Sequence, residues 1–194
     1  MKLYLTPGAC SLADHIALTE AGMDVEMIRV DLQTRLTEHG NNFVDVNPKG
    51  YVPALEFDDG EVLTENVAIL DWIVGEKPDL APEGRLGRSR NIEALAFIAT
   101  EIHRPFMRWM FSPADTEKQA AKQAITERMA LIASKLQSNY IFGDAFCTAD
   151  AFLYVMVRWA RDSGFDLSDK LIAYAQRVEA RPSVQKTLQA EGLS

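Results

Sequence analysis

Residues 3–11 of the chain read Leu-Tyr-Leu-Thr-Pro-Gly-Ala-Cys-Ser, and this stretch decides how the N-terminal part folds. A short run of β-favouring residues meets a proline–glycine turn, and the apolar spacing of Leu12, Ile16 and Ala17 then predicts a helix. We therefore expect Cys10 at the N-terminus of a helix. Free backbone N–H groups and the helix dipole favour an anion there by about 0.3–1 kcal/mol, which predicts a lowered thiol pKa.

The single thiol of this stretch admits two interpretations. It is either a reactive sulfur or a free cysteine that fills a small apolar gap. Residues 10–13 read Cys-Ser-Leu-Ala and contain no second cysteine, so the segment does not form a dithiol motif of its own. Any disulfide chemistry at Cys10 therefore requires an external thiol.

Composition restricts the classes of protein. The chain of 194 residues is 47% hydrophobic and 25% charged, which is ordinary for a globular protein with a full core. Its net charge of −8 argues against a general nucleic-acid binder. The two cysteines give no disulfide framework, and neither a targeting segment nor an apolar run of about 20 residues is recognised, so we expect a cytoplasmic protein that does not span a membrane.

The first part of the chain has an α/β pattern. Residues 25–30 alternate as a strand, and the order strand, helix, strand predicts a parallel βαβ unit. Residues 31–42 are polar and predict an irregular loop. Residues 54–64 predict an antiparallel hairpin, because the turn sequence Asp-Asp-Gly separates two β-favouring runs.

Two segments near this hairpin are suited to an extended ligand. A cis bond at Val52-Pro53 would turn the Val52 backbone outward to pair with a peptide, whereas a trans proline would simply begin the strand. Glu65 and Asn66 precede the apolar spacing of the next helix. They either only cap that helix or bind the ammonium and carboxylate of an amino acid.

The chain divides at a linker rich in proline and glycine. Residues 78–87 separate a domain at residues 1–77 from an all-helical bundle at residues 88–194, because the strand patterns end there and helical spacing takes over. His103 lies at the edge of the first apolar stripe of the bundle, where it either faces a crevice or is structural. Pro105 lacks a backbone N–H, so we expect a kink in that helix.

Several short motifs together resemble the bacterial beta class of the glutathione transferases. Each motif alone is weak, but their order and spacing extend over nearly the whole chain. They are PGACS at residues 7–11, NPKG and VPAL at 47–50 and 52–55, LTE and VAI at 63–65 and 67–69, TE and H at 100–101 and 103, F and AD at 146 and 149–150, and RP and AEGL at 181–182 and 190–193. The resemblance implies an α/β thioredoxin-like N-terminal domain with a mixed sheet, in the order βαβ-α-ββα, followed by an all-α bundle.

The resemblance also implies roles for individual residues. The cysteine that matches Cys10 faces the sulfur of bound glutathione and can form a mixed disulfide with it. The bond that matches Val52-Pro53 is cis, and its backbone pairs with the cysteinyl part of the tripeptide. Glu65 and Asn66 match the residues that hold the γ-glutamyl end.

Further residues are expected around glutathione and its electrophile. His103 is expected to line the site, and Ser11 is the second candidate, after Cys10, for activating the thiol. Because glutathione is anionic, its site needs cations. Unless they are ordinary surface side chains, the candidates are Arg35, Lys49, Arg104 and Arg108. The other substrate-binding candidates are Ala9, Tyr51, Thr100, Phe106, Trp109 and Met110, the last three as walls of an apolar cleft.

The chain departs from the usual pattern of the family at several positions. Asn66 replaces serine or glycine, and its amide is still expected to donate to a carboxylate. Leu5 replaces a common tyrosine and Tyr4 points to the other face of its strand, so a tyrosine is not expected to activate the thiol. Cys147 stands where serine or threonine usually caps a helix. We expect it to be buried and structural, with Asp150 bonding back to its N–H.

These observations lead to the hypothesis of a cytoplasmic, homodimeric glutathione transferase that acts in detoxification. Glutathione is the expected co-substrate, a hydrophobic electrophile or a disulfide is the expected second substrate, and no metal is expected. Another glutathione-dependent reaction, such as isomerisation, reductive dehalogenation or ether cleavage, is one alternative. A non-catalytic binding or regulatory protein of the same fold is the other.

Overall fold

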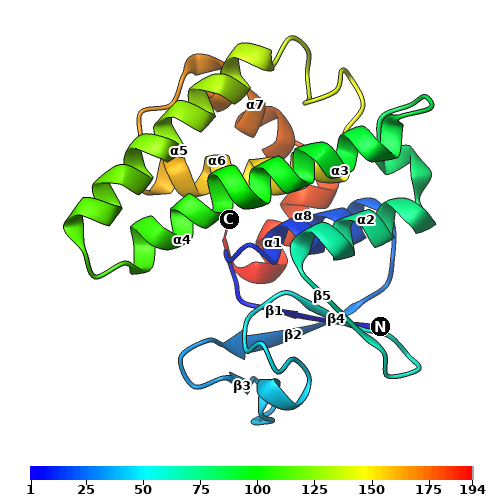
Figure 1. Ribbon diagram of the computed structural model, residues 1–194. Coiled ribbons are helices and arrows are strands. Elements are labelled where there is room, and N and C mark those ends of the chain that lie inside the picture. The colour runs from blue at the N-terminus through cyan, green and yellow to red at the C-terminus, as the bar shows by residue number, and fades with distance from the viewer. Residues whose placement is uncertain (194) are drawn as a thin grey trace.

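The computed structural model describes residues 1–193 and contains a five-stranded mixed sheet followed by helices (Figure 1). Strands β1 (Lys2–Leu5) and β2 (Glu26–Asp31) are parallel and are connected by α1 (Leu12–Glu20). This arrangement confirms the predicted βαβ unit. The strand order is β3-β2-β1-β4-β5, and every pair other than β1 and β2 is antiparallel.

The hairpin is also present, formed by β4 (Ala54–Glu56) and β5 (Val62–Thr64). The prediction of an irregular loop at residues 31–42 was wrong in part, because β3 (Leu36–Thr37) pairs with β2 there. A two-residue strand is too short to show an alternating pattern. The 3₁₀ helix η1 (Phe43–Asp45) follows it.

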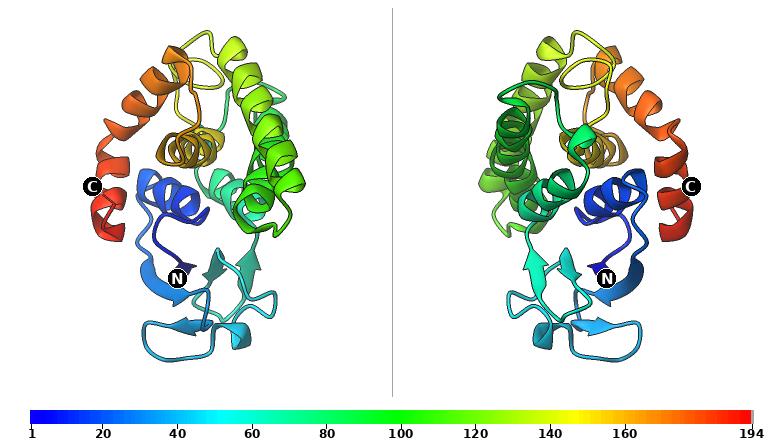
Figure 2. Two further views of the ribbon diagram at one scale, coloured as in Figure 1. Left: turned by 90° about the vertical axis from the view of Figure 1, so that its left-hand side faces the viewer. Right: turned by 90° about the vertical axis from the view of Figure 1, so that its right-hand side faces the viewer.

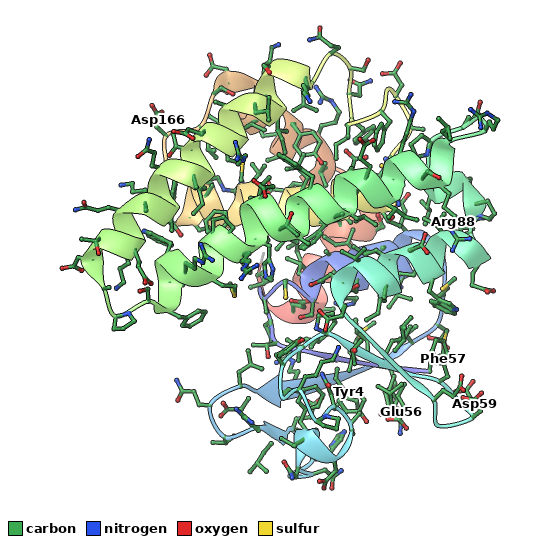
Figure 3. The ribbon with its side chains drawn as sticks, viewed as in Figure 1. Tyr4, Glu56, Phe57, Asp59, Arg88 and Asp166 are labelled. Atoms are coloured by element: carbon green, nitrogen blue, oxygen red, sulfur yellow. The ribbon has the colours of Figure 1, made fainter. Side chains whose placement is uncertain are left out.

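The two faces of the sheet pack against different clusters of buried side chains. Leu3 and Leu55 belong to the large core beneath α1 and α2 (Asn66–Glu76). Tyr4 lies on the other face, where its ring is 5.5 Å from that of Phe43. Its hydroxyl donates to Glu56 over 2.6 Å, and both side chains are labelled in Figure 3. As predicted, Tyr4 therefore points away from the face on which Leu3 packs against α1.

The C-terminal part is helical. The predicted linker contains the 3₁₀ helix η2 (Pro78–Leu80), and the division into two domains stays a prediction. None of the helices within residues 1–193 combines the length and apolar character needed to cross a membrane. The helices after η2 are α3 (Gly87–Phe97), the π-helix η3 (Ile98–His103), α4 (Arg104–Phe111), α5 (Asp115–Lys135), α6 (Thr148–Asp162), α7 (Asp169–Glu179) and α8 (Pro182–Glu191).

The chain accommodates Pro105 by widening a helix. Figure 1 shows α3, η3 and α4 as one continuous ribbon, where we had expected a kink. In η3 the Arg104 N–H bonds the Ala99 carbonyl, five residues earlier, rather than a carbonyl four residues earlier. The wider turn lies directly before Pro105, which has no N–H to donate. The pattern of helical hydrogen bonds therefore changes at this point.

Helix α6 is the centre of the C-terminal part, and Figure 2 shows it nearly end-on between the other helices. It packs against α1, and one continuous cluster of buried side chains includes residues of both helices. Cys147 precedes α6 and is buried, as predicted. Its N–H and its thiol both donate to Asp150, over 3.0 and 2.9 Å.

We predict that Asp150→Ala destabilises the protein by about 3 kcal/mol or more, because the backbone N–H groups of Ile141 and Cys147 and the Tyr174 hydroxyl, 3.0 Å from Asp150, would lose a buried acceptor. Urea unfolding measures the change. Asp166→Ala is the control, because this carboxylate is exposed (Figure 3), and we expect it to change the free energy of unfolding by less than about 0.5 kcal/mol. Equal stability of the two variants would contradict the proposed role of Asp150.

Candidate active site

A small groove of about 100 Å³ lies between the α/β part of the chain and η3. Residues from both parts of the chain form it, and seven of the predicted site residues are among them. The lining residues are Cys10, Tyr51, Val52, Pro53, Glu65, Asn66, Val67, Ala99, His103 and Phe152. A larger hollow of about 980 Å³ beside Trp72 and the β4–β5 hairpin contains none of the predicted site residues. We therefore regard the small groove as the candidate site.

The Cys10 thiol lies in this groove, with its sulfur 3.6 Å from the Val52 carbonyl oxygen. Its pKa is raised to about 12: burial is the largest cause and Asp14 acts in the same direction, whereas the backbone N–H groups of Cys10 and Ser11 act to lower it. The prediction of a lowered thiol pKa was therefore wrong. The helix-end effect is present, but removing the thiolate from water outweighs it.

The loop before Cys10 is held by the C-terminal part of the chain. Gly8 has a φ of 73°, and its N–H donates to the Glu191 carboxylate over 2.8 Å. The Trp159 indole N–H donates to the Gly8 carbonyl, also over 2.8 Å. Glu191 is buried and its other oxygen lies 2.8 Å from His15 Nδ1. Sequence reasoning assigned no role to Trp159 or Glu191, because the contacts join residues more than 150 positions apart.

The loop before β4 supplies backbone groups. The Val52-Pro53 bond is cis, as the family resemblance implied. Val52 precedes β4, so its backbone lies outside the sheet ladder, and its carbonyl accepts the Cys10 thiol. A backbone segment of this kind can pair with an extended peptide.

Glu65 also lines the groove, just before α2, with a φ of 78°. Lys49 and Tyr51 both donate to its Oε1, the latter over 2.7 Å. Partial burial acts to raise the pKa of Glu65, but these two hydrogen bonds lower it below its ordinary value. The carboxylate is therefore charged and able to pair with an ammonium group.

Asn66 is the first residue of α2 and is buried. Its amide nitrogen donates to the Cys10 carbonyl over 3.0 Å and to Asp14 Oδ2 over 2.6 Å. Both amide N–H groups thus have protein acceptors, and the expectation that this amide donates to a ligand carboxylate was wrong. The Asn66 backbone N–H has no partner inside the helix and is the better candidate.

His103 is the last residue of η3 and lines the groove, as predicted. Its ring lies 5.8 Å from that of Phe152 and 5.6 Å from that of Trp159. The Nε2 atom is buried without a hydrogen-bond partner among the described residues. Burial lowers the pKa of His103 to about 4, although Glu65 acts to raise it, so the imidazole is neutral near pH 7.

Models of one protein family match both parts of the chain. The N-terminal domain of glutathione S-transferases matches residues 9–75, and the C-terminal domain of the same family matches residues 100–191. The chain belongs to the glutathione S-transferase family. It is 41% identical to the glutathione S-transferase GstA of Escherichia coli O157:H7, with each chain covered completely.

Solved structures of other family members are also similar. A sphingomonad glutathione S-transferase complexed with glutathione is 44% identical, with a TM-score of 0.93 and complete coverage of both chains. The bacterial beta-class glutathione S-transferase of Sphingomonas chungbukensis is 45% identical, with the same TM-score and complete coverage of both chains. The fold predicted from the sequence is thus confirmed.

Several predicted site residues of this family member do not line the groove. Ser11 is fully buried, and its hydroxyl lies 3.3–3.4 Å from backbone atoms of Thr6. Its position does not favour a role as second activator. The Thr100 hydroxyl donates to the Ala96 carbonyl of its own helix. Ala9, Arg35, Arg104 and Met110 are also absent from the lining, and of the four candidate cations Lys49 alone contacts a groove residue through an ion pair.

The expected aromatic wall has a different position. Phe106 is fully buried, and its ring lies 5.6 Å from those of Trp159 and Phe165. The ring of Trp109 lies 5.1 Å from that of Phe165, in the same aromatic cluster. The prediction that Phe106 forms the wall was wrong, because apolar spacing does not distinguish a core face from a cleft. The apolar wall consists of Val67, Ala99 and Phe152.

We predict that His103 stays neutral from pH 8 down to pH 5. Its pKa of about 4 lies below the ordinary 6.5, so the unfolded chain binds more protons between these values and stability falls as the pH is lowered through this interval. Nuclear magnetic resonance of the imidazole measures the titration directly, with His103→Gln assigning the signal. A midpoint above pH 6 would contradict the prediction.

Proposed function

We propose that this protein binds glutathione in the groove and promotes attack of its thiolate on an electrophilic or disulfide substrate. The observation that carries the proposal is the convergence of the Cys10 thiol, the Val52 backbone and the Glu65 carboxylate on one groove. The similar sphingomonad structure with bound glutathione supports the choice of co-substrate.

The three groups suit three parts of the tripeptide. The Val52 backbone, which lies outside the sheet ladder, pairs with the cysteinyl residue in the manner of an added strand. The Glu65 carboxylate binds the γ-glutamyl ammonium, and the N-terminus of α2 binds the adjacent carboxylate. The glutathione sulfur then lies beside Cys10.

Cys10 acts on the glutathione sulfur as a hydrogen-bond donor. With a pKa of about 12 its thiol keeps its proton near neutral pH, and its single S–H can turn from the Val52 carbonyl to donate to the glutathione thiolate. A donor placed in advance stabilises the thiolate and increases its population. The thiolate then attacks an electrophilic carbon, a C–S bond forms, and the leaving group departs with the bonding electron pair.

Disulfide substrates use the same position. The Cys10 thiolate attacks one sulfur of oxidised glutathione, a new disulfide joins Cys10 to one glutathionyl group, and glutathione thiolate leaves. The high thiol pKa makes this step slow at neutral pH and faster as the pH rises.

The second substrate reaches the sulfur past Val67, Ala99 and Phe152, which suits an apolar molecule. The neutral His103 imidazole faces the same space and can donate or accept a hydrogen bond. We further propose that the protein is a homodimer in the cytoplasm and that its role is detoxification of electrophiles.

We predict that incubation with oxidised glutathione adds one glutathionyl group to the protein, at Cys10. Intact-protein and peptide mass spectrometry measure the adduct. Cys10→Ala removes it, and conjugation of a generic electrophile such as a chlorodinitrobenzene continues at a reduced rate, because the S–H donor is lost but the binding groups remain. Cys147→Ser is the matched control and keeps the adduct, since Cys147 is buried away from the groove. Full thiol-transferase activity of Cys10→Ala would contradict the role of Cys10.

We also predict that Glu65→Gln raises the KM for glutathione about tenfold or more, because the ammonium loses its charged partner. The kcat should change much less, since the carboxylate does not contact the sulfur in this proposal. Steady-state kinetics with varied glutathione measure both constants, and Glu61→Gln, at an exposed position, is the control. An unchanged KM would contradict the assignment.

A further inference from the structure

The Asn66 side chain connects the two helix ends that frame the groove. It belongs to α2, and it donates both to the carbonyl of Cys10, which precedes α1, and to the carboxyl of Asp14 within α1. Among the described residues these are the side-chain hydrogen bonds that join α2 to α1 and to the turn before it. Cys10 lies two residues before α1 and Glu65 lies directly before α2, so the connection sets the separation of thiol and carboxylate.

The other contacts between α1 and α2 are apolar. Ile16 of α1 and Ile69 and Ile73 of α2 are fully buried in the same core cluster. Apolar contacts hold two helices together but tolerate small shifts along their axes, because they are not directional. Hydrogen bonds of 2.6 and 3.0 Å do fix direction and length.

Asp14 lowers the stability of the fold, so its presence calls for another explanation. It is fully buried, and its Oδ1 has no hydrogen-bond partner among the described residues. A buried acceptor without a partner lowers stability, and no cation of residues 1–193 forms an ion pair with this carboxyl. Burial raises the pKa of Asp14 well above its ordinary value, which favours the neutral acid.

We propose that Asp14 is a positioning residue: it orients the Asn66 amide toward the Cys10 carbonyl, and the pair thereby fixes the distance between the thiol and the γ-glutamyl subsite at Glu65. This inference rests on the proposed function. The Asn66 amide nitrogen has two hydrogens, and the Asp14 carboxyl, by binding one of them, fixes the direction of the other. Neither side chain contacts the reacting sulfur in this arrangement.

The positioning role predicts different effects on two kinds of reagent: those that occupy both subsites, and those that react with the thiol alone. Oxidised glutathione binds through its γ-glutamyl end and must present its sulfur to Cys10. Iodoacetamide is small and needs the thiol alone. A shift of one helix end against the other therefore slows the first reaction and not the second. The ratio of the two rates also cancels any change in the thiolate fraction of Cys10, which affects both reactions.

The experiment compares these two rates in Asp14→Ala, Asp14→Asn, Asn66→Ala and the double variant Asp14→Ala/Asn66→Ala. We expect each alanine variant to lower the ratio about tenfold, and the double variant to lower it no further, because both side chains act as one unit. Asp14→Asn keeps an oxygen acceptor for the Asn66 amide and resembles the neutral acid, so it should restore the ratio to within about threefold of the wild type.

Asn91→Ala is the matched control. Asn91 is also a fully buried amide that joins two helices, with hydrogen bonds to Thr148 and Ala149 over 2.8 and 3.3 Å, but it does not line the groove. We expect it to lower the unfolding temperature without changing the ratio. Thermal unfolding of every variant identifies any that fails to fold, and Asp14→Asn and Asn66→Ala keep the test decisive if Asp14→Ala is unfolded.

An unchanged ratio in folded Asn66→Ala would overturn the inference, and so would a loss in Asn91→Ala equal to that in Asn66→Ala. A ratio in Asp14→Asn as low as that in Asn66→Ala would also overturn it, because the acceptor is retained there. Failure of the wild type itself to react with oxidised glutathione contradicts the proposed function, whereas a reactive wild type with insensitive variants contradicts the positioning role alone.

Discussion

Two side chains of the C-terminal part, those of Glu191 and Trp159, form hydrogen bonds with the backbone of Gly8, and the geometry of the site depends on them. A carboxylate accepts its N–H and an indole donates to its carbonyl, so the turn before Cys10 has fixed positions for both backbone groups. The position of the turn before Cys10 therefore depends on the C-terminal part of the chain as well. Trp159 also lies next to His103, which connects the same contact to the opposite wall of the groove.

The electrostatics of the groove follow from burial more than from helix ends. The thiol, the imidazole and Asp14 all have pKa values shifted toward their neutral forms, and burial is the largest cause for each. Glu65 differs, because Lys49 and Tyr51 stabilise its charge. A largely neutral groove with one charged end suits a ligand whose charges are concentrated at its own ends.

Local patterns predicted much of this from the sequence. The βαβ unit, the hairpin and the helical half follow from periodicity, and the order of short motifs identified the groove segments around Cys10, Val52 and Glu65. What could not be predicted depends on contacts between distant residues. Phe106 and Phe152 both have apolar helical spacing, yet the first lies in the core and the second lines the groove. Asp14 gave no signal at all, because its neighbour Asn66 is 52 positions away.

The continuous cluster of buried side chains that includes α1 and α6 has a consequence for how the molecule comes apart. Neither half possesses an interior that is complete without the other, since the face of α1 opposite the sheet is buried by α6. Heat or urea should therefore melt the chain in one cooperative transition, and a gene fragment ending near Lys77 should yield a poorly soluble, incompletely folded product.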